Sequence, residues 1–240
     1  MSLMINNLPE LNVYSYSVTI IIAVVLAKII ISHHYPHEPL NAFRFFCDKL
    51  AQKVNKSNSS ANQQSISGLV ALVITLTPLI IIIWLFEEFI EVKWLWQSML
   101  LYLSLGGCSL QQTTKKVAIA LSANQNYLAK QTLAPLVLRE TSQLSSMGLS
   151  KTCIEMQLLR TVQQSFTVVF YFVVAGPLAA ITYRLLLEMH YSWNIKQQKF
   201  TFFGKPCQQL INVLQWLPAR LFTLILLVGA IGSNLILFWR

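Results

Sequence analysis

Charged side chains are scarce in this chain of 240 residues, because Asp, Glu, Lys and Arg together make up only 11% of it. Soluble globular domains carry about 25% charged residues, so an ordinary soluble domain is excluded. Glycine and proline number only eight each, which excludes collagen-like sequence and Gly/Pro-rich disorder. Hydrophobic residues make up 55% of the chain, and its mean hydropathy is +0.54. This composition predicts an all-α, polytopic integral membrane protein.

Acidic residues are the scarcest charged type, with nine Asp and Glu against 18 Lys and Arg, a formal net charge of +9. The basic residues lie mostly between apolar runs and form no dense stripe, so we expect membrane lipids and no nucleic acid as partners. The cysteines have no paired spacing, which predicts free thiols and no metal site. They are Cys47, Cys108, Cys153 and Cys207.

Four apolar runs predict transmembrane helices, at about 13–31, 68–86, 94–110 and 221–239. A helix of 19 residues rises about 28 Å, close to the thickness of the hydrocarbon core. Glu10 and no basic residue precedes the first run, which favours a retained span over a cleaved signal peptide. Lys28, near the end of that run, is expected to extend to the headgroups. We expect one membrane domain over 1–240.

A fifth apolar segment, 166–187, carries Gly176-Pro177 near its middle. The polar segments 32–67 and 111–160 are rich in Lys and Arg, so the positive-inside rule places them in the cytoplasm and the N-terminus outside. A full crossing by the fifth segment would put the basic segment 188–217 outside, against that rule. Broken at Gly-Pro into halves of about 11 residues, it would instead form a re-entrant hairpin. We favour the hairpin, with a Pro-kinked span as the alternative.

Amphipathic helices are predicted at the membrane surface. One carries an apolar stripe of Leu40, Phe43, Phe46 and Leu50, and another covers 208–217. The polar run 56–64 is expected to be a loop.

Five short elements share one family pattern. They are Leu105-Gly-Gly-Cys-Ser-Leu110, Arg139-Glu140-Thr141, Glu155, Gly176-Pro-Leu-Ala with Tyr183-Arg184, and Leu217-Pro218-Ala219-Arg220-Leu221. At this spacing they resemble the CobD/CbiB cobalamin-biosynthesis membrane proteins, whose relatives include the AmpE proteins associated with β-lactamase regulation. The pattern can be laid along roughly residues 30 to 228.

The resemblance implies a multi-pass protein of the bacterial inner membrane similar to adenosylcobinamide-phosphate synthase. That activity is an ATP-dependent, amide-forming ligation of an aminopropanol phosphate to a corrinoid acid, and the family implies ATP and Mg²⁺. It also implies a cytoplasm-facing substrate site lined by Arg139, Glu140, Thr141, Glu155, Arg184 and Arg220, whereas the catalytic residues stay unknown. The alternative is a non-catalytic, AmpE-like accessory or regulatory protein that binds another membrane protein.

Three segments depart from the family pattern by losing carboxylates. Leu159–Gln164 reads LRTVQQ where the family usually reads Glu-Asn-Thr-Val-Asp-Gly, and Leu187–Ser192 reads LEMHYS in place of Asn-Thr-Leu-Asp-Ser-Met. Gln208–Asn212 replaces Ala-Arg-x-Asp-Asp. Oxygen ligands for Mg²⁺ are therefore scarce, and the sequence leaves open whether this chain is an enzyme.

Arginines are the residues we expect to carry ligand binding, namely Arg139, Arg184 and Arg220. A guanidinium is always charged and binds phosphate or carboxylate through a planar fork. Arg220 follows Pro218, which predicts the first turn of the last helix, where backbone amides add to anion binding. The alternative for Arg220 is an anchor at the headgroups.

Overall fold

The computed structural model describes residues 11–34, 40–55, 59–106, 108–137 and 140–238, and these residues are helical or lie in short connections without a strand. The predicted all-α class is confirmed for this part of the chain. Three helical stretches are long and apolar enough to cross a membrane. They are Ala61–Phe89, Ser146–Ser192 and Lys205–Gly229.

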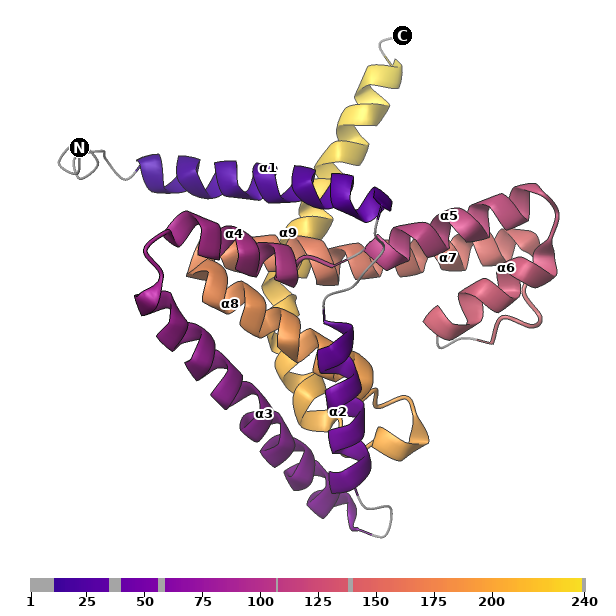
Figure 1. Cartoon of the computed structure of the whole chain (residues 1–240). Helices are drawn as coiled ribbons and strands as arrows, with labels where there is room; N and C mark the ends of the chain where they lie inside the picture. Colours follow the sequence, from indigo (N-terminus) through magenta and orange to yellow (C-terminus); the bar gives the residue numbers. More distant parts are fainter. Residues whose placement is uncertain (1–10, 35–39, 56–58, 107, 138–139, 239–240) are drawn as a thin grey trace.

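The body of the molecule is built by six helices around one apolar core. They are α1 (Leu11–His34), α2 (Asn41–Val54), α3 (Ala61–Phe89), α4 (Lys93–Ser104), α8 (Thr167–Ser192) and α9 (Lys205–Phe238). Helix α8 contacts α2, α3, α4 and α9 and lies at the centre, while α1 lies along α4 (Figure 1). A connection that includes the short helix η3 (Gln198–Phe200) joins α8 to α9, and its Trp193 and Phe203 are fully buried.

A second, smaller apolar cluster holds together an arm that projects from the body (Figure 1). The arm contains α5 (Cys108–Ser122), α6 (Asn126–Leu133), the short helix η1 (Ala134–Leu136) and α7 (Ser146–Thr161). Leu133 and Leu149 are completely buried inside it. The predicted polar segment 111–160 is therefore a packed helical unit.

Helix α2 confirms the predicted helix in segment 32–67 but turns a different face inward. Cys47 and Ala51 are fully buried, whereas Phe46 is 52% exposed. Helix α3 begins at Ala61, inside the predicted loop, because Ser60 accepts from the Gln63 backbone amide and the Gln63 side chain accepts from the Ser60 amide. Such a capping box satisfies amides that a helix start leaves unpaired.

The apolar run 94–110 does not form one helix. Helix α4 ends at Ser104, Leu105 is extended, and α5 starts at Cys108. A helix of 12 residues is about 18 Å long. The Lys28 ammonium donates to the Tyr102 carbonyl at 3.0 Å and also to the Leu105 carbonyl, so it satisfies groups at the end of α4. Lys28 is 9% exposed and does not extend to the surface as predicted.

Helix α9 runs through both the predicted surface helix 208–217 and the predicted span 221–239, with Pro218 inside it. Proline cannot donate to the carbonyl four residues earlier, which here belongs to Leu214. The Tyr171 hydroxyl donates to that carbonyl at 2.9 Å, so the helix continues across the proline. Arg220 therefore lies inside a helix that begins at Lys205, and the predicted first turn at Pro218 is wrong.

Helix α8 is interrupted at Gly176, whose φ of 86° and ψ of −178° are not helical. In a straight helix, Tyr171 and Tyr183 would lie about 18 Å apart along the axis, yet their rings stack at 5.4 Å. The Tyr183 hydroxyl also donates to the Gln163 carbonyl at 2.9 Å. The two halves of α8 therefore pack side by side as an antiparallel hairpin (Figure 1). Its placement in a membrane stays a prediction.

Candidate functional site

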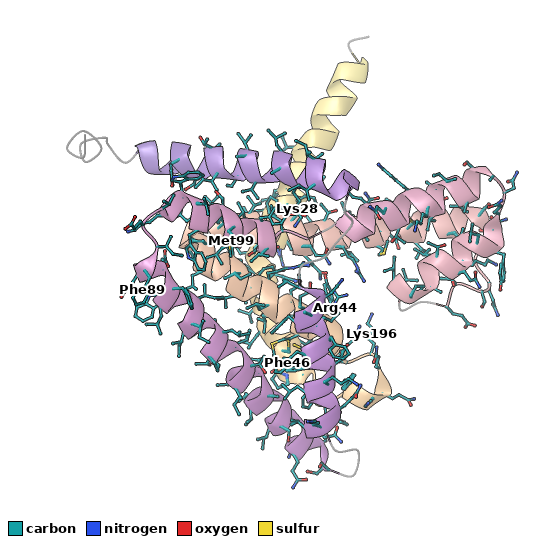
Figure 2. All side chains as sticks on the ribbon, in the orientation of Figure 1. Lys28, Arg44, Phe46, Phe89, Met99 and Lys196 are labelled. Atoms are coloured by element: carbon teal, nitrogen blue, oxygen red, sulfur yellow. The ribbon has the colours of Figure 1, made fainter. Side chains whose placement is uncertain are left out.

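A buried ion pair lies on the second half of α8. Arg184 is 2% exposed and Glu188 is 1% exposed, and Arg184 Nη2 lies 2.6 Å from Glu188 Oε1. Arg44, in the first turns of α2 (Figure 2), donates from Nε to Glu188 Oε2 at 2.9 Å. One carboxylate thus holds two guanidinium groups, which offsets part of the cost of removing these charges from water.

A third guanidinium joins this cluster through Tyr191. Arg160, in the last turn of α7, lies over the Tyr191 ring at 5.2 Å, and Arg44 lies over the same ring at 6.0 Å. The Ser192 hydroxyl donates to the Asp48 carboxylate. Three guanidinium groups therefore face two carboxylates, so these residues carry a net positive charge. We call Arg44, Arg160, Arg184 and Glu188 the arginine cluster.

A π-helical turn, η2 (Val162–Phe166), places two glutamines beside the cluster. The Tyr191 hydroxyl donates to Gln163 Oε1 at 2.8 Å and accepts from Gln164 Nε2 at 3.4 Å. One extra residue per turn rotates the following side chains relative to an α-helix, and such turns are frequent at functional sites. The turn therefore joins the start of the α8 hairpin to its end.

Helix α9 supports this arrangement from behind. Gln215 Nε2 donates to the Tyr183 hydroxyl at 3.0 Å, and Gln163 Nε2 donates to Gln215 Oε1 at 3.2 Å. A network in which most members have partners fixes the orientation of its side chains. The site is thus held by α8, η2 and α9 together.

Gly106, in the connection between α4 and α5, closes the cluster from another direction. A Cβ at this position would lie 2.7 Å from Arg184 Nη1 and 2.8 Å from Gln164 Oε1. The Gly106 amide donates to the Gln164 carbonyl at 3.2 Å. The close approach needs a residue without a side chain, which gives the second glycine-rich position of the LGGCSL element a physical role.

Some polar atoms of the site have no hydrogen-bond partner among the described residues. They are Arg184 Nε, Arg184 Nη1 and Gln164 Oε1, all buried. A buried unpaired donor costs about 1–3 kcal/mol. The site can therefore offer guanidinium N–H groups to an oxygen acceptor.

Of the six residues predicted for the substrate site, Arg184 lies in the arginine cluster. Arg139 lies outside the described residues. Glu140 is exposed and accepts from the Ser142 hydroxyl at 3.0 Å, in the connection before α7, where Thr141 is 7% exposed.

The remaining two predicted residues are exposed. The Glu155 side chain is 56% exposed and lies 4.0 Å from Lys151 on α7. Arg220 lies over the Trp216 ring at 5.3 Å on α9. Neither has a printed contact with the arginine cluster, so their predicted roles rest on the resemblance alone.

Sequence reasoning did not include Arg44, Arg160, Gln164 or Tyr191 in the site. A signal was present, because the segments Leu159–Gln164 and Leu187–Ser192 were recognised as departures from the family pattern. The structure brings these two segments into contact through Tyr191. Arg44 had no such signal, since it belongs to an ordinary basic stretch before the second predicted span.

Three cysteines are free thiols, as predicted, and all are buried: Cys47, Cys153 and Cys207. The side chain of Cys108 lies outside the described set. Burial, together with the nearby Asp48 and Glu188 carboxylates, raises the pKa of the Cys47 thiol to about 12. This thiol is therefore neutral and unreactive at physiological pH.

Comparison with known proteins gives one consistent family. The family model described as CobD/Cbib protein matches residues 20–240. The cobalamin biosynthesis protein CobD of Stutzerimonas stutzeri is 31% identical over 183 residues, covering 76% of this chain and 60% of that protein. The CobD protein of Chromobacterium violaceum is 29% identical, covering 72% and 54%.

The cobalamin biosynthesis protein CbiB of Salmonella choleraesuis is 25% identical over 147 residues, covering 61% of this chain and 46% of that protein. The chain thus spans about half the length of the curated relatives that it matches. No solved structure is similar enough to count as a match. The family model covers nearly the whole sequence, and the chain therefore belongs to the CobD/CbiB family.

Proposed function

We propose that this chain acts in cobalamin biosynthesis as a multi-pass protein of a bacterial inner membrane. The names of its relatives support the pathway, and three long apolar helical stretches support the membrane location. The observation that carries the proposal is the arginine cluster, since charged side chains that pack inside membrane-type helices are costly and mark functional sites.

The reaction implied by the family joins an aminopropanol phosphate to a corrinoid carboxylate. An acyl group activated by phosphorylation from ATP is attacked by the amine, and the phosphate leaves as the amide forms. We assign Arg184 to hold an anionic group of the substrate, because it is buried and has unpaired donors. Arg139, Glu140, Thr141, Glu155 and Arg220 stay proposals carried by the resemblance.

Magnesium does not fit the residues of the arginine cluster. Mg²⁺ takes hard oxygen ligands, but both Glu188 oxygens lie against guanidinium groups. The Asp48 carboxylate accepts from Ser192. Within the described part of the chain, no group of three His, Cys, Asp or Glu side chains could hold a metal ion. No step of the proposed reaction is therefore assigned to Mg²⁺ at this cluster.

A re-entrant α8 hairpin completes the proposal. Arg160 precedes the hairpin, Tyr191 lies at its end, and the two are in contact. Arg44, from segment 32–67, also contacts Tyr191. The positive-inside rule predicts both 32–67 and 111–160 to be cytoplasmic, which supports a cytoplasmic end for the hairpin and a cytoplasm-facing site.

A non-catalytic, AmpE-like accessory role is the second candidate. It is supported by Glu188, whose two oxygens are both occupied by arginines, since such a carboxylate is poorly suited to act as a general base. A protein of this kind would bind another membrane protein and form no amide bond.

Amide formation separates the two candidates. The purified chain is incubated with corrinoid acid, aminopropanol phosphate, ATP and MgCl₂, and the amide product is detected by mass spectrometry. The proposed enzyme makes the product, and Arg184→Gln lowers the rate by at least about tenfold. Absence of product from folded protein, together with failure to complement a strain lacking its own CobD, would exclude the enzyme and leave the accessory role.

A further inference from the structure

We propose that the arginine cluster binds an oxyanion, a phosphate or carboxylate group, directly through guanidinium N–H groups and without a divalent metal ion. This deepens the proposed function by naming how the same site holds an anionic ligand. It rests on that function only for the ligand's biological origin, because the binding chemistry follows from the residues themselves.

The first observation is the surplus of positive charge. Arg44, Arg160 and Arg184 converge on Glu188 and Tyr191 from α2, α7 and α8. A buried ion pair is most stable when its charges balance, yet one guanidinium here has a ring and no printed carboxylate as its partner. An added anion would balance the charge.

The second observation is the set of unpaired donors. Arg184 is 2% exposed, and among the described residues its Nε and Nη1 have no hydrogen-bond partner. Arginine N–H groups bind planar or tetrahedral oxyanions with shorter and stronger hydrogen bonds than neutral donors do. Gly106 leaves the Arg184 side chain free of a Cβ at the point of closest approach, so the loop does not cover these donors with a side chain.

The third observation is access. The Arg44 side chain is 33% exposed, and Arg160 and Tyr191 are half-buried. The cluster therefore has two guanidinium groups near its surface and one behind them. An anion that enters past Arg44 and Arg160 meets charged donors along its path, and electrostatic attraction favours this entry.

Metal-independent binding follows from the carboxylates. Mg²⁺ binds phosphates in proteins by combining one or two carboxylates with the phosphate oxygens. Glu188 is already shared by Arg44 and Arg184. Gln163 and Gln164 stand in the segment where the family pattern has Asp-Gly, so a carboxylate is replaced by an amide in this chain. Guanidinium groups take the place of the metal in neutralising the ligand.

The experiment measures binding of radiolabelled inorganic phosphate to the full chain in nanodiscs of phosphatidylcholine, with EDTA or with MgCl₂. Arg160→Gln removes the half-buried charge of the cluster. Lys151→Gln is the matched control, because it removes one positive charge from the same helix at an exposed position, 79% exposed. Circular dichroism checks that each variant is folded.

We expect phosphate to bind equally with EDTA and with MgCl₂, and Arg160→Gln to weaken it by about tenfold while Lys151→Gln changes it less than about twofold. Binding that needs MgCl₂, or equal losses in the two variants, would overturn the proposal. Loss of amide formation with phosphate binding intact would count against the proposed function alone.

A second arm identifies the source of the oxyanion. Nanodiscs that contain phosphatidylglycerol are compared with phosphatidylcholine alone. If the cluster takes a soluble phosphomonoester, phosphatidylglycerol leaves phosphate binding unchanged. If it takes a lipid headgroup, phosphatidylglycerol competes with phosphate in the unmodified chain, and Arg160→Gln removes that competition. Both results support an oxyanion site, whereas competition that persists in Arg160→Gln would overturn it.

Discussion

At the scale of single residues, the buried pair Arg184–Glu188 and the exposed pair Lys151–Glu155 have the same spacing of four residues on a helix. Their environments differ in every other respect. Glu188 is 1% exposed, so removing its partner leaves an uncompensated charge inside the protein. Such a change typically costs about 3–5 kcal/mol, whereas exposed pairs of this spacing contribute about 0.3–0.5 kcal/mol.

We therefore expect Arg184→Met to lower the thermal unfolding midpoint in detergent strongly, and Arg184→Met combined with Glu188→Leu to recover part of the loss. Lys151→Met is the control, with a change below about 0.5 kcal/mol. Fluorescence-detected size-exclusion chromatography after heating measures all three. A double variant no more stable than Arg184→Met would contradict the explanation by an unpaired charge.

Gly106 supplies a second test at this scale. A Cβ there would press on the flexible ends of Arg184 and Gln164, at 2.7 and 2.8 Å. Because flexible side chains can shift, Gly106→Ala should cost little stability but should displace the guanidinium. Displacements of about 1 Å in a binding site can cost up to about 100-fold in rate.

We expect Gly106→Ala to lower phosphate binding or amide formation at least about tenfold with an unfolding midpoint close to that of the unmodified chain. Gly229→Ala is the control, since a Cβ there would meet nothing within 4 Å. Equal binding in the two variants would show that the cluster tolerates displacement of Arg184.

At the scale of elements, the α8 hairpin depends on a backbone conformation that side chains rarely adopt. Gly176 has a φ of 86° and a ψ of −178°, and non-glycine residues in such regions cost about 1–3 kcal/mol. No atom lies within 4 Å of an added Cβ, so the cost of Gly176→Ala would arise from the backbone alone.

We predict that Gly176→Ala lowers the free energy of unfolding by about 1–3 kcal/mol and weakens the contact between Tyr171 and Tyr183. Gly148→Ala, in a helix with ordinary contact distances of 3.4 Å and more, should be neutral or slightly stabilising. Thermal unfolding of both variants in the same detergent provides the comparison. Equal midpoints would argue against a strained turn at Gly176.

The elements also show what sequence reasoning can reach. Long apolar runs predicted the cores of α1, α3 and α9, because burial in hydrocarbon dominates those stretches. The end of α4 could not be predicted, since it depends on Lys28 from another helix. The continuity of α9 across Pro218 likewise depends on Tyr171, 43 residues from Leu214.

The site was less accessible to sequence reasoning than the fold. Arg184 was named correctly as a member because it combined a charge with an apolar segment. Arg44 lies 144 residues from Glu188, and no local pattern links such positions. The prediction that Arg220 gains from helix-terminal amides failed because α9 begins at Lys205.

At the scale of the whole molecule, membrane orientation is the property still to be measured. The native cysteines are poor reporters, since Cys47, Cys153 and Cys207 are all buried. Exposed positions suit labelling better: Lys53, Glu91, Ser142 and Gln198. Single substitutions of these residues to cysteine place a reactive thiol in each polar segment.

With a membrane-impermeant maleimide added outside, we expect labelling of Glu91→Cys only. Protection of Lys53→Cys, Ser142→Cys and Gln198→Cys would place the three segments on the cytoplasmic side, as a re-entrant hairpin requires. Outside labelling of Gln198→Cys alone would mean that α8 crosses the membrane. The unmodified chain serves as the control for reaction at the buried thiols.

The position of Lys28 has a consequence for how the chain is made. The carbonyls that its ammonium contacts lie 74 and 77 residues later in the sequence. Synthesis runs from the N-terminus, so α1 leaves the ribosome before those acceptors exist. An ammonium ion disfavours the bilayer interior, and α1 must therefore wait with Lys28 in contact with water. The arrival of α4 completes the first helix, so that insertion of this protein proceeds in pairs of helices.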